Sequence, residues 1–304
     1  SDGPMRFTLP AKRFLALVSS FPPGDEVRLE FDGRRATLRH GRGRYALDCL
    51  NADDYVLRKK AASSDVIRVL ASDLREALGF CAPSMARNDV RFFLNGAYIE
   101  FGDDGLTVVS TDGHRMASAR VKAATPQAKG GVILPNYTAR ELHSMLGDFT
   151  GEVILSVGSG SCRIDVGEYE INSALLDATY PDWRRAIVSD VDTVGVDVQP
   201  VVSSLKRMAL FSNREDHAGV RLSFAGGSLR LNTLNSEADE TVEVDGEMNH
   251  VAGFNTQYLI DAMSVWTSEQ VEVGIRTKDG AQAAMRVRIA GDDSRVVVLM
   301  PMRL

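Results

Sequence analysis

Five segments of the chain share one pattern, in which one or two apolar residues and a residue suited to a helix cap precede a short amphipathic helix. Phe14, Leu74, Leu142, Leu205 and Leu259 occupy equivalent places, and their successive separations are 60, 68, 63 and 54 residues. Between the helices, apolar and polar residues alternate and are interrupted by turn dipeptides such as Asp-Gly and Gly-Gly, which is typical of antiparallel strands. We therefore predict an α+β fold of repeated βαβββ modules.

A single module of this kind cannot bury both the apolar stripe of its helix and the apolar face of its sheet, so we expect modules to pair, two to a domain. The polar stretches 51–65 and 177–190 are typical of connectors. They predict three domains, with residues 1–60 as a half-domain of one module and residues 61–182 and 183–304 as complete domains. The helix of the half-domain should expose apolar surface unless a partner covers it.

The composition excludes several classes of protein. The chain of 304 residues is 44% hydrophobic and 25% charged, which is ordinary for a globular protein. No apolar stretch approaches the roughly 20 residues that span a bilayer, and the first residues lack a secretory signal, so we expect a cytoplasmic protein without membrane association. Cys49, Cys81 and Cys162 are scattered, which favours small buried side chains over disulfides or a zinc site. The net charge of −6 argues against nucleic-acid binding over the whole surface, but not against a local basic face.

The stretch STDGHRMA at residues 110–117 permits two interpretations. His114 could be a general base that Asp112 orients, or the segment could be a β-turn, for which Asp-Gly is a common choice. No serine or cysteine nucleophile and no metal-ligand cluster stands elsewhere at a recognisable spacing. We therefore predict no catalytic residue, no metal site and no cofactor.

Six stretches then carry a family resemblance, in the order NDVRFFLNG (88–96), STDGHRMA (110–117), YPDWRR (180–185), GVRL (219–222), GFNTQYL (253–259) and VVVLMPMRL (296–304). Over nearly its full length, the chain resembles the bacterial DNA sliding clamps, the β subunits of DNA polymerase III. In that family three domains of two modules form a crescent, and two crescents close head to tail around duplex DNA, with helices inside and sheets outside. The resemblance implies a non-enzymatic processivity factor in which the first module of the first domain is missing.

The resemblance also implies a pocket between the second and third domains that binds a short linear motif. Its ligands would be DNA polymerase III, clamp-loader subunits, and repair polymerases, ligase or mismatch-repair proteins. The residues that correspond to this pocket are Leu94, Thr111, Gly113, His114, Arg115, Met116, Pro181, Ala186, Ile187, Asn255, Tyr258, Val298, Met300, Pro301 and Met302. Methionine and proline suit an adaptable apolar groove, but Val298 and Met300 could equally be strand core. Deletion from Val298 onward is expected to abolish partner binding and leave the fold intact.

Basic residues on or after the first four helices would face double-stranded DNA without reading its sequence, because phosphate contacts carry no sequence information. They are Lys12, Arg75, Arg87, Arg91, Arg140, Lys206, Arg207 and Arg214. The alternative interpretation is that these residues belong to solvated helix faces.

Ring closure would join the first module of one subunit to the last domain of the next, with an apolar centre rimmed by opposite charges. The corresponding residues are Arg13, Leu17, Phe21, Tyr45, Leu47, Leu210, Phe211, Glu237, Asp239 and Glu240. Leu17 and Phe21 could instead be core. The sequence thus predicts a homo-oligomeric sliding clamp, or alternatively a clamp-derived module that binds partner peptides without encircling DNA.

Overall fold

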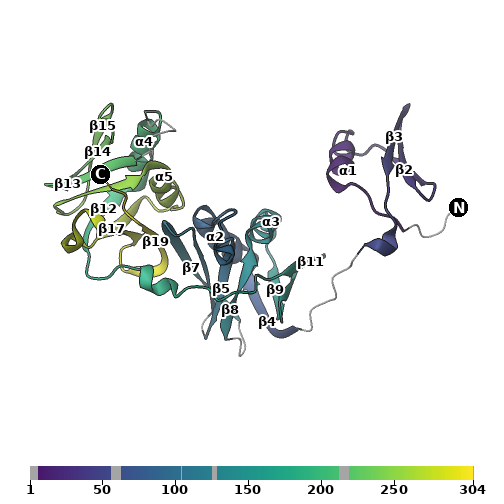
Figure 1. The fold of residues 1–304 in the computed structure, drawn as a ribbon, viewed down its shortest axis with the longest axis horizontal. Coiled ribbons are helices and arrows are strands. Elements are labelled where there is room, and N and C mark those ends of the chain that lie inside the picture. The colour runs from purple at the N-terminus through teal and green to yellow at the C-terminus, as the bar shows by residue number, and fades with distance from the viewer. Residues whose placement is uncertain (1–5, 56–62, 104, 125–128, 212–218, 304) are drawn as a thin grey trace. The chain divides into compact units, whose positions relative to one another are not determined.

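The structure is a computed structural model that describes residues 6–55, 63–103, 105–124, 129–211 and 219–303 (Figure 1). The chain divides into two compact units, Ser1–Lys59 and Lys60–Leu304, which are described separately. No helix among the described residues combines the length and the apolar character that crossing a membrane requires.

The first unit holds one helix and one small sheet. Helix α1 (Ala11–Val18) precedes three antiparallel strands in the order β1-β2-β3, which are β1 (Arg28–Phe31), β2 (Arg35–His40) and β3 (Gly43–Asp48). Ala36, Leu38 and Leu47 are the buried apolar residues among those described in this unit, whereas every residue of α1 stays at least partly exposed. The exposed apolar side chains Leu15 and Val18 agree with the expectation for a module without a paired module.

The second unit contains four modules in the predicted βαβββ order, which confirms the predicted fold class. The first two, here called the central pair, consist of β4 (Ser63–Leu70), α2 (Ala71–Cys81), β5 (Gly96–Gly102), β6 (Gly105–Thr111), β7 (Arg115–Ala124), β8 (Gly130–Pro135), α3 (Asn136–Leu146), β9 (Glu152–Gly158), β10 (Ser161–Val166) and β11 (Tyr169–Ala174). The next two, the C-terminal pair, consist of β12 (Asp192–Asp197), α4 (Val198–Ala209), β13 (Gly219–Ala225), β14 (Ser228–Thr233), β15 (Asp239–Glu243), β16 (His250–Asn255), α5 (Thr256–Ser264), β17 (Gln270–Ile275), β18 (Met285–Ile289) and β19 (Asp292–Leu299).

The junctions between strand and helix differ from the expected side-chain caps. At α5, the Asn255 side chain accepts a hydrogen bond from the Tyr258 N–H at 3.0 Å. At α2, α3 and α4 no side chain caps the helix, but the first N–H of each donates to a backbone carbonyl of another segment. The N–H of Asn136, for example, donates to the Asn95 carbonyl at 2.9 Å. Tertiary contacts therefore satisfy groups that a local cap would otherwise satisfy.

The two module pairs share one sheet. Strand β7 of the central pair forms an antiparallel ladder with β19 of the C-terminal pair, in which Arg115 lies opposite Leu299 and Ala119 lies opposite Arg295. This ladder, called the seam below, joins strands into the order β11-β10-β9-β4-β7-β19-β18-β17-β12. Helix α2 packs on α3, and α4 packs on α5. Figure 1 shows α2 and α3 side by side along one face of the central strands.

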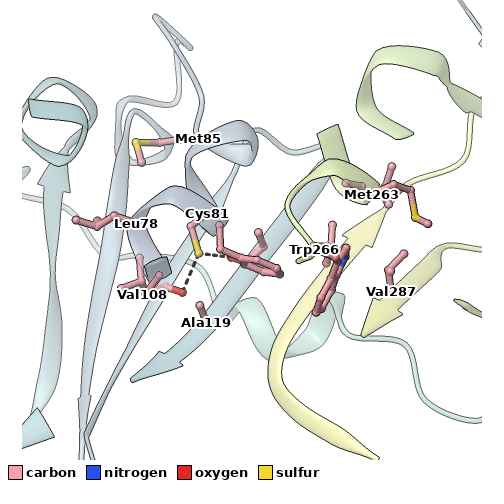
Figure 2. Close-up of a cluster of buried hydrophobic side chains, with 14 of the residues drawn as sticks. Leu78, Cys81, Met85, Val108, Ala119, Met263, Trp266 and Val287 are labelled. Atoms are coloured by element: carbon pink, nitrogen blue, oxygen red, sulfur yellow. Dashed lines mark hydrogen bonds between the residues drawn. The ribbon is translucent and has the colours of Figure 1, made fainter. Parts of the chain in front are cut away.

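Alternation along the strands of the seam separates two apolar cores, because successive side chains of a strand point to opposite faces. Ala117, Ala119, Val297 and Leu299 face the large core beneath the helices. Figure 2 shows part of that core, where Cys81 Sγ of α2 donates to the Val108 carbonyl at 3.3 Å and Trp266 approaches from the C-terminal pair. Met116 and Val298 face the other way, into a smaller cluster that also contains Val109, Ile133, Tyr180, Ala284 and Val296.

The segment between the two pairs is packed rather than a bare polar connector. Tyr180 is buried in the smaller cluster, and Trp183, Ile187 and Val188 pack around it. Arg184 adds a bidentate contact to Glu100, with nitrogen to oxygen distances of 3.0 and 2.6 Å. The smaller cluster and this covering segment are called the connector cluster below.

Candidate functional site

The turn at residues 111–115 is fixed by its own side chains. One carboxylate oxygen of Asp112, Oδ1, accepts hydrogen bonds from the backbone N–H groups of His114 and Arg115 at 2.9 and 3.0 Å. Gly113 adopts a φ of 87°, and a Cβ added there would lie 2.7 Å from Arg91 Nη1. The left-handed backbone is therefore what favours glycine here, because the Arg91 atoms near the added Cβ lie at the end of a flexible side chain.

Arg115 points toward the helices and joins the two module pairs. Its Nη1 lies 2.6 Å from Asp261 Oδ2 on α5, and its Nε lies 3.0 Å from the second oxygen of Asp112. The guanidinium carbon lies 4.2 Å from the centre of the Tyr258 ring, so a cation–π contact adds to the ion pairs. Arg115 is thus held by three partners before any ligand is considered.

The predicted pocket residues gather at the end of the seam, where the turn, α5 and the chain's last residues meet. The Met300 N–H donates to the His114 carbonyl at 2.8 Å, and the Met302 N–H donates to the Gly253 carbonyl at 2.8 Å. The His114 ring lies over Tyr258 with ring centres 6.2 Å apart. At this edge, His114, Met300 and Pro181 keep exposed surface, while Asn255, Tyr258, Pro301 and Met302 are half-buried.

Other predicted pocket residues lie on separate faces of the sheet. Leu94, Met116 and Val298 are buried, and Ala186 and Ile187 are half-buried within the connector cluster. Arg115 projects from the opposite face, because it is one residue from Met116 on the same strand. The predicted pocket residues therefore divide into three groups: a group with exposed surface at the end of the seam, here called the edge site, a group in the connector cluster on one face of the sheet, and Arg115 on the opposite face. Deletion from Val298 would also remove Leu299 and the end of the seam, which contradicts the expectation that the fold would stay intact.

The predicted DNA-facing residues fall into different environments. Arg75 lines a cavity of about 800 Å³, and Arg87 and Arg140 line a second cavity of about 580 Å³ on the helix side. Arg91 instead belongs to the turn, where it pairs with Asp89 and donates to the Asp112 carbonyl at 3.0 Å. The Arg91 hydrogen bonds lower the pKa of Asp89 to about 2.

On the remaining helices, Lys12 and Lys206 are exposed, whereas Arg207 is paired with Glu240 at 2.5 Å. Arg214 lies outside the described residues.

Of the ten predicted interface residues, six are exposed, three are half-buried and one is buried. Arg13, Tyr45, Leu210, Phe211, Glu237 and Asp239 have exposed surface, and Leu17 is half-buried. Phe21 stacks on His40 with ring centres 4.3 Å apart. Leu47 is buried in the first unit, because it packs under the sheet opposite Ala36, so its prediction as an interface residue is corrected. Glu240 is committed to Arg207 and to the Ser204 hydroxyl, which together lower its pKa to about 2.

Several residues that hold the two pairs together were not predicted. Asp261 is the partner of Arg115, and Gln257 donates to its other oxygen at 2.8 Å. Glu76 of α2 lies 2.5 Å from Arg295 of β19, and Phe80 meets Trp266 edge to face at 4.9 Å. These partners lie far apart in the sequence, so no local pattern could have identified them. Among the described residues, no group of three or more His, Cys, Asp or Glu side chains converges in a way that could hold a metal ion.

Two family profiles match the second unit. The profile described as DNA polymerase III beta subunit, central domain, matches residues 69–182, and the profile of the C-terminal domain matches residues 189–303.

Whole-chain comparisons reach further. The beta sliding clamp of Pseudomonas putida is 33% identical over 307 residues, which cover 99% of this chain and 83% of that protein. The beta sliding clamp of Escherichia coli K12 is 29% identical and covers 98% of this chain and 81% of its own length.

Solved structures agree with these matches. A crystal structure of the DnaN sliding clamp of Pseudomonas aeruginosa bound to griselimycin superimposes with a TM-score of 0.88 at 31% identity, covering 98% of this chain and 81% of that one. The Caulobacter crescentus pol III beta structure gives 0.87 at 28% identity, covering 100% of this chain and 84% of that one.

Paired βαβββ modules with helices on one face and a shared antiparallel sheet define a DNA clamp. The chain belongs to the bacterial DNA polymerase III beta sliding clamp family.

Proposed function

We propose that several copies of this chain close into a ring around duplex DNA in the cytoplasm and keep DNA polymerase III on its template. The observation that carries the proposal is the similarity to beta sliding clamps over 99% of the chain, which includes the first unit as well as the four complete modules. A closed ring is retained on DNA by its topology, so the basic residues near the helices need only weak phosphate contacts. The exposed apolar side chains of α1 and of Leu210 and Phe211 support an oligomer.

The edge site at the end of the seam would bind the short linear motif of the polymerase, the clamp loader and repair proteins. Met300 and Met302 offer flexible apolar surface beside the polar His114. A peptide strand laid across this edge would contact the exposed side chains of both module pairs at once. The site needs residues of both the central and the C-terminal module pair. One such surface would serve several partners that carry the same short motif.

The role would be non-catalytic. Both carboxylate oxygens of Asp112 are engaged, one by two backbone N–H groups of its own turn and the other by Arg115. Asp112 is therefore already committed and does not orient His114 as a general base. The turn is therefore better suited to present His114 and the Met300 strand end to a ligand than to move protons.

Loading the protein onto nicked circular DNA with a clamp loader and ATP, followed by linearisation, tests the ring. A clamp stays on the circle and is lost from the linear DNA. A protein that binds a motif peptide but never associates with the circle would be an interaction module, and the proposal of a ring would then be wrong.

A matched pair of methionine variants tests the edge site. Met300 and Met145 are 41% and 39% exposed, but Met145 lies on α3, away from the predicted pocket residues. Met300→Ala should weaken the binding of a fluorescent motif peptide about ten-fold, as expected for an anchor at a peptide site. Met145→Ala should leave the affinity unchanged. Equal effects of the two variants would exclude the edge site.

A further inference from the structure

Helix α1 of the first unit carries an apolar stripe that stays exposed. Ala11, Leu15 and Val18 follow the i, i+4, i+7 spacing of one helix face, and all three are exposed. The exposed fractions of Leu15 and Val18 are 66% and 38%. Phe14 and Leu17 lie on another side of the helix and are half-buried. The three exposed side chains, called the α1 stripe below, are therefore available to a partner.

The equivalent positions of the central pair are the places where one helix meets the other. Leu15 and Val18 are the fifth and eighth residues of α1. The fifth and eighth residues of α3 are Arg140 and His143, and both contact α2. His143 Nδ1 lies 3.0 Å from the carbonyl of Arg75, the fifth residue of α2, and Arg140 Nη2 donates to the carbonyl directly after α2 at 3.1 Å. The α1 stripe thus lies where a module's helix meets the helix of its paired module.

All four modules of the second unit also exchange their first strands in pairs. In the central pair, β8 before α3 pairs with β5, and β4 before α2 pairs with β9. In the C-terminal pair, β16 pairs with β13, and β12 pairs with β17. In the first unit, residues 6–10 before α1 form no strand ladder with any described residue, and β1 pairs only with β2. The first unit therefore has both parts of the exchange, the donor segment and the accepting edge, without the paired module.

The segment before α1 is suited to such an exchange. Phe7 stacks on Phe31 of β1 with ring centres 4.4 Å apart, and the Thr8 N–H donates to the Leu50 carbonyl at 3.3 Å. A single copy thus folds the segment back on its own module. Exchange would replace the Phe7 contact by a contact with β1 of another copy, so two copies can pair without losing apolar contact at this segment.

We propose that the first units of two copies of this chain pair with each other and complete one domain between them. The two α1 stripes pack together, and residues 6–10 of each copy extend the sheet of the other copy at β1. The other helices are already packed as α2 on α3 and α4 on α5, so the module that a second copy can offer is its first unit. Arg13 and Leu17, which were predicted to close a ring, do not belong to the stripe. The pairing is therefore separate from ring closure and does not require DNA.

A twofold axis between two copies makes the stripe its own partner, because each residue then meets the same set of residues twice. The contact between the fifth residue of α2 and the eighth residue of α3 places Leu15 of one copy beside Val18 of the other. Both side chains are apolar, and their burial drives association. No charged residue belongs to the stripe, so the twofold axis brings no like charges together within it.

Sedimentation equilibrium of the full chain without DNA, over a range of protein concentrations, tests the pairing. Leu15→Lys is the primary variant, because Leu15 is exposed and its replacement removes nothing from a core. It should weaken association about a hundred-fold, which is about ten-fold for each of the two leucines in the pair. Ala16→Lys is the matched control, since Ala16 is also exposed on α1 but lies outside the stripe, and it should associate as the wild type does.

Cysteine variants identify the contact itself. Leu15→Cys mixed with Val18→Cys should form a covalent dimer with a short thiol crosslinker, because the proposed contact joins these two positions. Ala16→Cys mixed with Val18→Cys should give no more dimer than the wild type. The wild type reports the background from its own cysteines, of which Cys49 is half-buried and the other two are buried.

Three results would overturn the inference. The first is a wild-type chain that stays monomeric at every concentration, which would leave the stripe to a separate polypeptide. The second is equal crosslinking in the mixtures with Leu15→Cys and with Ala16→Cys. The third is an oligomer that Arg13→Glu dissociates and Leu15→Lys does not, since that oligomer would be held by the ring-closing contact. The proposed clamp function is judged separately, by retention on circular DNA, so either proposal can fail alone.

Discussion

Breaking the ion pair between Arg115 and Asp261 should destabilise the second unit, because this pair links the two module pairs. The Arg115 side chain is 11% exposed and that of Asp261 is 26% exposed, so solvent screens the pair only in part. Removing one partner of a fully buried pair costs about 3–5 kcal/mol, and a charged hydrogen bond contributes about 1.5–3 kcal/mol. With Asp261 partly solvated, we expect the pair to contribute about 2 kcal/mol.

The variants should differ in a defined way. Asp261→Asn should cost about 2 kcal/mol, and Arg115→Met about 3 kcal/mol, because it also loses the cation–π contact with Tyr258. The double variant should cost about 3 kcal/mol rather than about 5, which is a coupling of about 2 kcal/mol.

Urea unfolding of the single and double variants measures this coupling. The surface pair Arg230 and Asp239 is the control, since their side chains are 58% and 54% exposed and their coupling should stay below about 1 kcal/mol. If the losses from Arg115→Met and Asp261→Asn simply add, the pair does not stabilise the seam and the reasoning is refuted.

Three further predictions concern packing, pH and DNA. Gly96→Ala should lower the free energy of unfolding in urea by about 2–3 kcal/mol. The new Cβ would lie 2.5 Å from the backbone oxygen of Leu134, which cannot move freely. A loss below about 0.5 kcal/mol would contradict this. Arg207 lowers the pKa of Glu240 from 4.5 to about 2, and because the pair is partly exposed, it stabilises the fold by at most about 1 kcal/mol. This stabilisation is present above pH 4.5 and is lost as the pH falls toward 2. Glu240→Gln should therefore flatten the plot of unfolding free energy against pH between pH 4.5 and 2, and an unchanged plot would exclude the effect. Lys206→Glu should weaken duplex binding without changing unfolding, whereas Arg207→Glu should lower stability; the opposite pattern would show that Arg207, not Lys206, faces DNA.

Much of the fold could be predicted because its signals are local. The helical spacing of Leu74, Leu142, Leu205 and Leu259 marks buried positions on α2, α3, α4 and α5, since each of these side chains is buried. The alternation between helices gives strands whose apolar residues face one side, as in β13, where Val220, Leu222 and Phe224 enter the core. The helical spacing and the strand alternation of apolar residues follow from backbone geometry alone, so the sequence shows them without any knowledge of tertiary contacts.

The candidate site was predicted less completely because its geometry depends on register and on distant partners. Neighbouring residues Arg115 and Met116 were assigned to one pocket, yet strand alternation sends them to opposite faces. The partner of Arg115 lies 146 residues further along the chain. Leu47 was expected at an interface because the family resemblance places an edge strand there, but the small first unit needs that side chain for its own core.

The shared sheet also determines where a ring built from such subunits can bend. From Arg115 to Ala119, β7 is bound to β19 by main-chain hydrogen bonds, and the covering segment at Tyr180 closes the other face. A hinge at this position would have to break the ladder and expose two apolar layers at once. The central and C-terminal pairs should therefore move as one rigid body, so any bending in an assembly of such subunits is expected at the contacts between chains.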